Sequence, residues 1–408
     1  MKGIHHWTVT VTYEPPTHPL RSFHDHKARY IRRNKPGTVH RSAEHTLFSS
    51  VIVCSNLSGN CLILEYVVCF VICSLYPVKY LIVMYREGLF SVNLYSTFVR
   101  PAKFYLGGFY NIPHIKYYYV FLGFVYIMTV LGNGFLLSVI YLVKTLHTPK
   151  CIIVFNLALT DLCGSTALIP KLLDTYLFDR RYIVYEACLT YMFFVLLFLS
   201  IQSWTLVTMA YDRVVAICFP LRYYSLVTTK SVVAILLCSL IILISVIATL
   251  TGFINRLSFC ASLEIKTFFC DHGPIYQLAC NDKSYSYMMA NDALILVICI
   301  PLIVIFGSYV CISIALARTT SRGKRLRAMK TCTFHLILVA IFFLPFVGTN
   351  IAVLTSYIHP NARNLNSSLT YTIPPLLNPI IYSLKTEEVR NAIRRLCKRD
   401  KLNKTAIK

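Results

Sequence analysis

Charge is scarce in this 408-residue chain, because only 14% of its residues are Asp, Glu, Lys or Arg. A soluble globular domain carries about 25% charged residues, so the shortage argues against a water-soluble fold. Acidic residues are rarer still, with 17 Asp and Glu against 40 Lys and Arg. A basic excess is also typical of nucleic-acid binding, but here the charges fall between long apolar runs. Membrane topology explains that distribution better, and we expect no nucleic-acid partner.

Several kinds of site are also missing from the sequence. The 16 cysteines form no CxxC pair and no zinc-binding spacing, so we expect no metal centre. No nucleophile lies in a recognisable arrangement with a base, so we expect no catalytic residues and no enzyme activity. The internal repeat that is typical of transporters is not visible either.

Long apolar runs are what the sequence has in place of charge. Hydrophobic residues make up 56% of the chain, and a helix needs about 20 mainly apolar residues to cross a bilayer. Seven stretches qualify and predict an all-α membrane protein, a seven-transmembrane helix bundle. They are Tyr117–Val143, Ile152–Phe178, Cys188–Phe219, Ser231–Phe253, Ser286–Ala317, Thr331–Ser356 and Ser367–Leu384.

The loops between these spans predict the orientation of the bundle. One alternating set of loops, together with the C-terminal tail, holds nineteen Lys and Arg, whereas the other set holds six. The richer set faces the cytoplasm by the positive-inside rule. We therefore expect the segment before the first span to lie outside the cell and the C-terminus to lie in the cytoplasm.

Four regions follow from this pattern. Residues 117–384 form the seven-span core, and residues 91–116 form an extracellular lead-in. Residues 385–408 place Val389 and Ile393 at helical spacing among basic residues, which predicts an amphipathic helix on membrane lipid and a basic tail. Residues 1–90 match no pattern, and we expect an atypical N-terminal extension without fixed structure.

Charged residues inside spans are costly and mark candidate functional sites. Asp161 lies in the middle of the second span, and Asp212 and Arg213 lie side by side at the cytoplasmic end of the third. Two partly desolvated charges stabilise each other when paired. An unpaired Asp161 carboxylate must instead take up a proton or find a partner.

Short motifs in a fixed order narrow the family. The first, second, third and seventh spans hold LGNG (Leu131–Gly134), LALTD (Leu157–Asp161), Asp212-Arg213-Val214 and NPIIY (Asn378–Tyr382). This set resembles the rhodopsin-like (class A) G protein-coupled receptors. The further motifs LHTPK, MAYDRVVAICFPLRY, SYVCI, KTCTFHL and PPLLNPIIYSLKTEEVRNAI are similar to those of the odorant (olfactory) receptor family. Val214 departs from the tyrosine that is usual in that family.

The resemblance implies a role for four residues in G-protein coupling and activation. Arg213 would leave its Asp212 partner on activation and meet the terminal helix of a heterotrimeric G protein. Arginine suits that role because it stays charged and offers several donors. Tyr309 and Tyr382 stand where related receptors carry tyrosines that swing toward this arginine. The alternative is that both are ordinary interfacial tyrosines.

The resemblance also implies a polar core and two disulfides. Asp161, Asn378 and Asn133 stand at positions that help to bind a sodium ion, but Gln202 puts a neutral amide beside them. A sodium ion and a protonated or hydrogen-bonded Asp161 are both open. The four cysteines on the outer side allow three pairings, and the resemblance favours Cys188–Cys270 with Cys260–Cys280.

The resemblance places a ligand pocket in the outer half of the third, fifth, sixth and seventh spans. Mostly apolar side chains with few polar groups suit a small organic ligand, here an odorant, at the plasma membrane. The alternative is a non-olfactory receptor of the same class for an endogenous lipid or peptide. The candidate pocket residues are Leu196, Leu199, Ser200, Phe343, Phe346 and Asn350.

Overall fold

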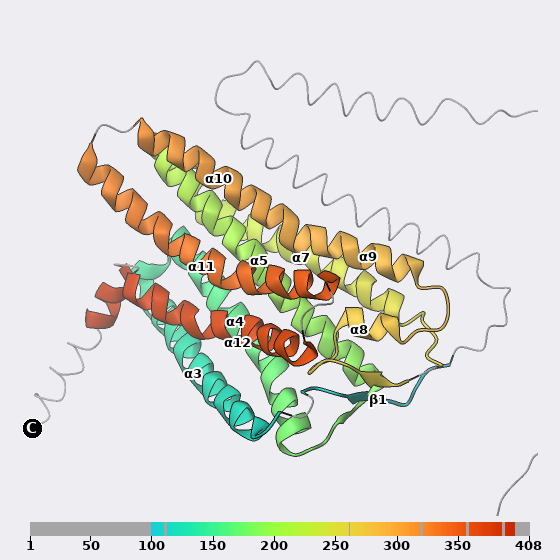
Figure 1. Cartoon of the computed structure of the whole chain (residues 1–408). Coiled ribbons are helices and arrows are strands. Elements are labelled where there is room, and N and C mark those ends of the chain that lie inside the picture. Colours follow the sequence, from blue (N-terminus) through green and yellow to red (C-terminus); the bar gives the residue numbers. More distant parts are fainter. Residues whose placement is uncertain are drawn as a thin grey trace, which may run out of the picture. The chain divides into compact units, whose positions relative to one another are not determined.

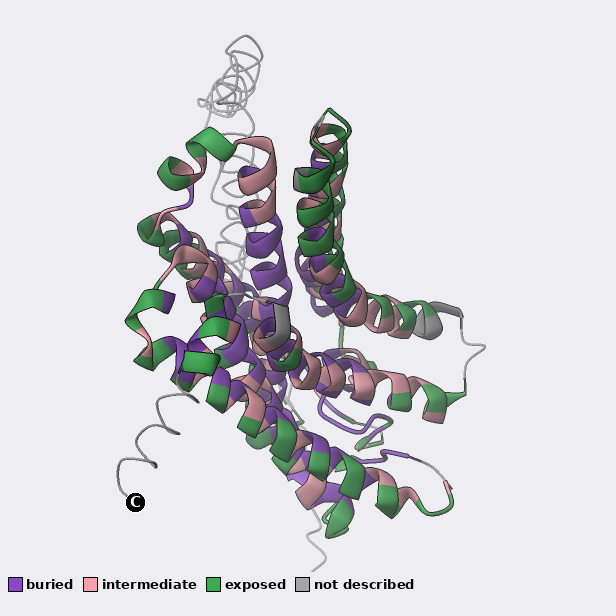
Figure 2. Cartoon of the chain, turned by 90° about the vertical axis from the view of Figure 1, so that its left-hand side faces the viewer, coloured by how far each residue is buried: buried purple, intermediate pink, exposed green. Residues whose placement is uncertain are grey.

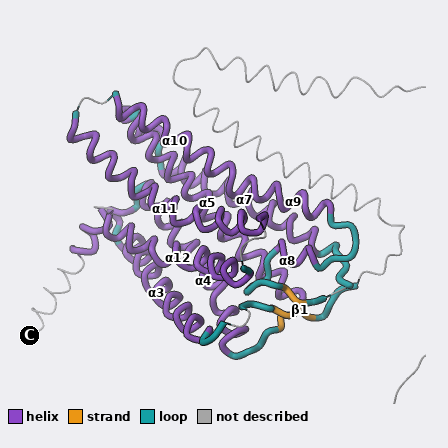
Figure 3. The backbone as a smooth tube through the Cα atoms, viewed as in Figure 1, coloured by secondary structure: helices purple, strands orange, loops and turns teal. Residues whose placement is uncertain are grey.

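The computed structural model describes residues 99–109, 112–260, 262–318, 321–355, 359–385 and 388–395. The predicted extension at residues 1–90 and the basic tail beyond residue 395 lie outside the described residues. Helices dominate the described part, and a small sheet joins three loops at one end of the helix bundle (Figures 1 and 3).

The long helices follow the order of the predicted spans (Figure 1). They are α3 (Ile115–Leu142), α4 (Pro149–Leu177), α5 (Tyr185–Cys218), α7 (Thr229–Ile254), α9 (Ser284–Leu294), α10 (Ile300–Ala317), α11 (Arg322–Thr355) and α12 (Pro360–Lys385). A π-helical turn, η4 (Ile295–Cys299), joins α9 to α10 as one span. Shorter elements are η2 (Lys144–Leu146), η3 (Pro220–Arg222), α6 (Tyr223–Leu226), α8 (His272–Gln277) and a short helix at 388–395, within the stretch where an amphipathic helix is predicted.

The structure changes the bounds of the last two predicted spans. In the described residues, six helical spans are long and apolar enough to cross a membrane, and α12 is not among them. The first half of α12 is rich in Asn, Ser and Thr, yet α12 packs against α3, α4 and α11. It begins at Pro360 rather than Ser367 because proline is well suited to the first turn of a helix.

The outward faces of the helices are apolar. Figure 2 shows exposed residues along the outer faces and buried residues between the helices. On α3 and α10 the exposed residues include Phe124, Leu131, Ile303 and Phe306. A monomeric soluble protein rarely exposes such contiguous apolar surface, so these faces suit contact with lipid.

The sheet is an element that the sequence did not predict. Strand β1 (Lys103–Leu106) pairs antiparallel with β2 (Tyr182–Val184) and parallel with β3 (Glu264–Ile265). The expected lead-in is thereby tied to the loops after α4 and α7. We call this end of the bundle the sheet end, and the opposite end, where α5 finishes, the Arg213 end.

Candidate functional site

The Asp212 carboxylate is a buried anchor near the end of α5. Its Oδ2 lies 3.7 Å from the Arg213 Nε, and its Oδ1 accepts a 2.8 Å hydrogen bond from the Tyr223 hydroxyl on α6. Burial and the nearby Asp212 charge raise the pKa of Tyr223, so the phenol keeps its proton and remains the donor. The predicted Asp212–Arg213 pair is therefore present, but Tyr223 makes the shorter contact.

A second polar group joins α5, α10 and α11. The His335 Nε2 lies 3.2 Å from the carbonyl oxygen of Leu206, and its Nδ1 lies 2.7 Å from the Tyr309 hydroxyl. Because a carbonyl can only accept, Nε2 carries the ring proton and Nδ1 accepts from Tyr309. His335 therefore links three helices through hydrogen bonds of its two ring nitrogens.

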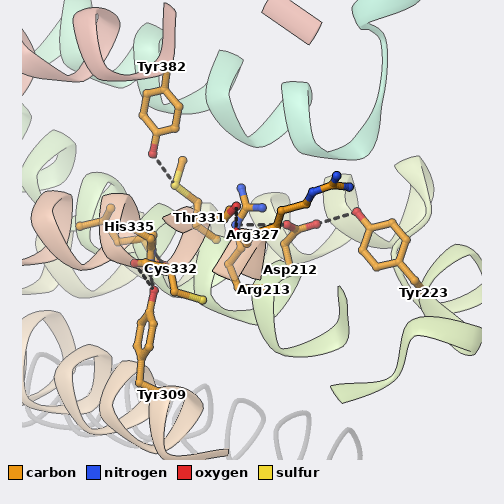
Figure 4. Close-up of polar contacts among 11 residues, drawn as sticks. Asp212, Arg213, Tyr223, Tyr309, Arg327, Thr331, Cys332, His335 and Tyr382 are labelled. Atoms are coloured by element: carbon orange, nitrogen blue, oxygen red, sulfur yellow. Dashed lines mark hydrogen bonds and ion pairs between the residues drawn. The ribbon is translucent and has the colours of Figure 1, made fainter. Parts of the chain in front are cut away.

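Tyr382 reaches α5 from α12. Its hydroxyl donates to the Met209 Sδ at 2.8 Å. Figure 4 shows Tyr382 and Tyr309 approaching the inner part of α5 from opposite sides, with Asp212 and Arg213 beyond them. The structure brings the four predicted coupling residues to one end of the bundle. The hydrogen bonds drawn in Figure 4 join neither tyrosine to Arg213.

Two exposed side chains at this end were missed in the sequence. Leu221 is 99% exposed and Tyr224 is 87% exposed, on η3 and α6, directly after Pro220. The two exposed apolar side chains lie three residues apart outside the apolar spans, so together they are a candidate contact for a partner protein. The signal was present in the motif ending FPLRY, whose Leu221 follows the proline that ends the span.

Asp161 is fully buried and neutral amides surround it. The Gln202 Nε2 donates to its Oδ1 and the Asn378 Nδ2 donates to its Oδ2, both at 2.8 Å. Asn133 donates elsewhere, to the carbonyls of Thr129 and Pro375. The predicted polar core is assembled around Asp161, although Asn133 bonds to backbone rather than to the carboxylate.

The chemistry of this core fits a cation or an ordered water. The Asn133 Oδ1 and the Ser165 Oγ are buried and have no hydrogen-bond partner among the described residues. Ser165 lies one helical turn after Asp161 on α4, so both side chains project from the same face. Spare oxygen acceptors and a carboxylate are the kinds of ligand that a hard cation such as sodium prefers.

Four of the six candidate pocket residues belong to the main apolar core of the bundle. Leu199 and Phe343 are buried in it, and Leu196 and Phe346 pack against it. The polar members satisfy themselves locally, because the Ser200 hydroxyl bonds the Leu196 carbonyl and the Asn350 amide bonds the Phe346 carbonyl. A ligand in contact with these side chains would therefore meet a largely apolar surface.

One acidic residue inside a span was overlooked in the sequence. Asp292 lies on α9 within the fifth span, and its Oδ2 is buried with no hydrogen-bond partner among the described residues. A carboxylate inside a predicted span is a sufficient signal by itself. It places a carboxyl group with an unpaired buried oxygen in the sheet half of the bundle.

Covalent and strand contacts fix the sheet end. Disulfides join Cys188 to Cys270 and Cys260 to Cys280, with Cα separations of 5.6 and 5.9 Å. The lead-in is also tied to the seventh span, because the Asn364 Nδ2 donates to the Gly108 carbonyl at 2.8 Å. These links cover the sheet end with chain segments far apart in sequence.

Two adjacent titratable residues, half-buried Asp271 and buried His272, follow the first disulfide. The Asp271 carboxylate accepts a 2.8 Å bond from the His272 backbone N–H, and the His272 Nε2 lies 3.1 Å from the Ser286 hydroxyl. Burial raises the pKa of Asp271 to about 6 and lowers the pKa of His272 to about 4. The raised pKa of Asp271 and the lowered pKa of His272 have opposite effects on how the stability of the fold changes with pH.

Known proteins share most of this chain. The family model described as "Olfactory receptor" matches residues 122–400. Olfactory receptor 1468 of Rattus norvegicus is 36% identical over 290 residues, which cover 69% of this chain and 90% of the relative. Olfactory receptor 8B8 of Mus musculus is 34% identical over 300 residues, 73% of this chain and 96% of the relative. Olfactory receptor 1L6 of Homo sapiens is 35% identical over 274 residues, which cover 66% of this chain and 78% of the relative.

Proposed function

We propose a division of roles between the two ends of the bundle, starting from the fact that this chain belongs to the olfactory receptor family. It is accordingly a multi-pass membrane receptor and not an enzyme. In our proposal the sheet half binds a small organic odorant, and the Arg213 end activates a heterotrimeric G protein.

The proposed topology places the sheet end outside the cell at the plasma membrane. Both disulfides lie at that end, and disulfides persist in oxidising compartments. The Arg213 end carries the basic start of α11, where Arg322, Arg325 and Arg327 are exposed. Positive loops favour the cytoplasmic side, so two independent features support the same orientation.

The proposed ligand site is the apolar cluster around Leu199, Phe343 and Phe346. Its polar groups bond their own helices, so a ligand would gain most from buried apolar area, about 25 cal/mol per Å². A small, mainly apolar molecule fits that chemistry.

One observation carries the proposed coupling, namely the arrangement of groups around the inner part of α5. Tyr223 and Asp212 hold one side of it, and Tyr309 and Tyr382 bond His335 and Met209 instead of Arg213. We interpret this as the resting arrangement. Activation would free Arg213 for the G protein, with exposed Leu221 as a second contact.

Replacing Arg213 by alanine tests this function. Arg213 and Leu199 are separated by about 20 Å along α5, from a rise of 1.5 Å per residue, so a ligand cannot touch both. Arg213→Ala should therefore abolish G-protein activation while leaving ligand binding and surface level intact. The measurement is cAMP production in cells given a mixture of short-chain alcohols, aldehydes and esters.

Lys230→Ala is the matched control, since it removes one exposed positive charge from the same end of the bundle. It should signal like the unmodified receptor. Full activation by a well-expressed Arg213→Ala receptor would show that Arg213 does not carry the coupling.

We also propose that the Asp161 core binds sodium. Asp161, Ser165 and Asn133 would supply oxygen atoms, and the ion would neutralise a buried carboxylate. Asp161→Asn should then remove the difference in melting temperature and odorant response between NaCl and choline chloride. Asp282→Asn, at an exposed loop residue, should keep that difference. If the unmodified receptor shows no difference between the two salts, the site holds no sodium.

A further inference from the structure

Pro301 removes one backbone donor from the fifth span. In a regular α-helix the N–H of residue 301 would bond the carbonyl of residue 297, but proline has no N–H. Pro301 stands in the first turn of α10, directly after the π turn η4. Val297 is buried, so an unpaired carbonyl there would be costly.

Ser203 supplies the missing donor from the neighbouring helix. Its hydroxyl donates to the Val297 carbonyl at 2.6 Å, and Ser203 is fully buried on α5. At another contact between helices, a side chain again donates to a carbonyl that a proline leaves without its donor. Pro379 would leave the Pro375 carbonyl without its donor, and the Asn133 amide of α3 bonds that carbonyl at 2.9 Å.

Because the contact lies at the π turn, it affects the rotation of the rest of α10. The Ile300 N–H bonds the Ile295 carbonyl, five residues back, so the turn holds one residue more than an α-helical turn. Relaxing it to α-helix would rotate the following helix by about 100°, the angle between successive residues. Tyr309 would then face away from His335, its partner on α11.

We propose that Ser203 is a positioning residue whose hydroxyl replaces the donor removed by Pro301 and thereby holds the π turn that aims Tyr309 at α11. The bond and its effect on helix packing stand on the geometry alone. Its effect on signalling rests on the proposed receptor function.

A double-mutant cycle on melting temperature tests the bond. The full-length receptor in lipid nanodiscs is compared with Ser203→Ala, Ser203→Thr, Pro301→Ala and the Ser203→Ala/Pro301→Ala double variant. Ser203→Ala should lower the melting temperature by roughly 3 °C, because it leaves a buried acceptor unpaired. Ser203→Thr keeps the hydroxyl and should restore most of the loss.

The Pro301→Ala background tests whether the Ser203 hydroxyl is needed because of the proline. The alanine in that variant has an N–H of its own for the Val297 carbonyl, so removing the Ser203 hydroxyl in that background should cost less than half as much. Equal losses in both backgrounds would overturn the proposal. If Pro301→Ala does not fold, Ser203→Ala is judged against Thr208→Val, because Thr208 bonds the carbonyl of its own helix at Trp204. A Ser203→Ala loss no larger than that of Thr208→Val then overturns it.

Signalling per surface receptor tests the positioning role. With the same odorant mixture, Ser203→Ala should reduce the cAMP response roughly fivefold relative to Thr208→Val, and Ser203→Thr should recover it. An unchanged response in a destabilised Ser203→Ala receptor would overturn that role. If the unmodified receptor does not respond at all, the proposed function fails, while the melting-temperature cycle still decides the fate of the Ser203 bond.

Discussion

The two ends of the bundle are held together by different kinds of bond. At the sheet end, two disulfides and three paired strands link the lead-in, two loops and α12. At the Arg213 end, side-chain hydrogen bonds such as Tyr223–Asp212 and Tyr309–His335 join helices that otherwise meet through apolar contacts.

This difference assigns rigidity and movement to opposite ends. A covalent link of widely separated residues stabilises a fold by several kcal/mol, whereas one hydrogen bond contributes about 1 kcal/mol. Bonds of the second kind can exchange partners at small cost. This contrast agrees with the proposed function, in which the Arg213 end switches between two arrangements and the sheet end keeps a ligand site in shape.

Breaking the first disulfide should have the largest effect. Cys188→Ser or Cys270→Ser should reduce the surface level roughly tenfold or more, because the bridge closes a loop of 82 residues in sequence separation and long loops gain most from closure. Flow cytometry of an N-terminally tagged receptor measures this. Cys260→Ser should be milder, since that bridge spans 20 residues.

Cys238→Ser provides the control for the disulfide variants, because Cys238 is a free, exposed cysteine on α7. It should leave the surface level unchanged. Normal surface levels in both Cys188→Ser and Cys270→Ser would mean that the covalent link does not hold the sheet end.

Removing one hydroxyl at the Arg213 end should change signalling rather than folding. Tyr223→Phe deletes the 2.8 Å bond to Asp212, worth about 1 kcal/mol, so basal cAMP should rise roughly fivefold at an unchanged surface level. Tyr224→Phe loses the hydroxyl of the exposed neighbouring ring and serves as the control. A large fall in surface level for Tyr223→Phe alone would contradict the contrast between the two ends.

The smallest expected effect concerns pH at the sheet end. The pKa of Asp271 is raised to about 6, so the folded state binds this proton more readily than the unfolded chain. Its contribution to stability falls as the pH rises from about 4 to about 6. The pKa of His272 is lowered to about 4, so its contribution falls as the pH drops from about 6.5 to about 4.

These opposing slopes predict a nearly flat melting temperature across that range in the unmodified receptor. Asp271→Asn should expose the histidine contribution, so its melting temperature should decline as the pH drops from about 6.5 to about 4. Asp282→Asn, in the same loop but exposed, should remain flat. A melting temperature for Asp271→Asn that rises on acidification would contradict the assigned pKa shifts.

Local patterns were sufficient for much of this protein. Apolar runs located the long helices, since the length of a membrane helix is set by the bilayer. Ordered motifs such as Asp212-Arg213 and NPIIY pointed to the family that the comparisons then showed. The start of α11 at Arg322 was missed, because a helix can continue past the membrane face with no change in its own hydrogen bonding.

Contacts between distant residues were decided only by the tertiary structure. The pairing of β1 with β3 joins Tyr105 to Glu264, and strands this short carry too little pattern to be recognised alone. The partners of Asp212, His335 and Val297 come from other helices, so their identity depends on helix rotation. By itself, the sequence located the long apolar helices and the polar residues that lie within them. Only the packing of the helices decided which of those groups meet, because a buried donor or acceptor takes the partner that rotation and distance place beside it.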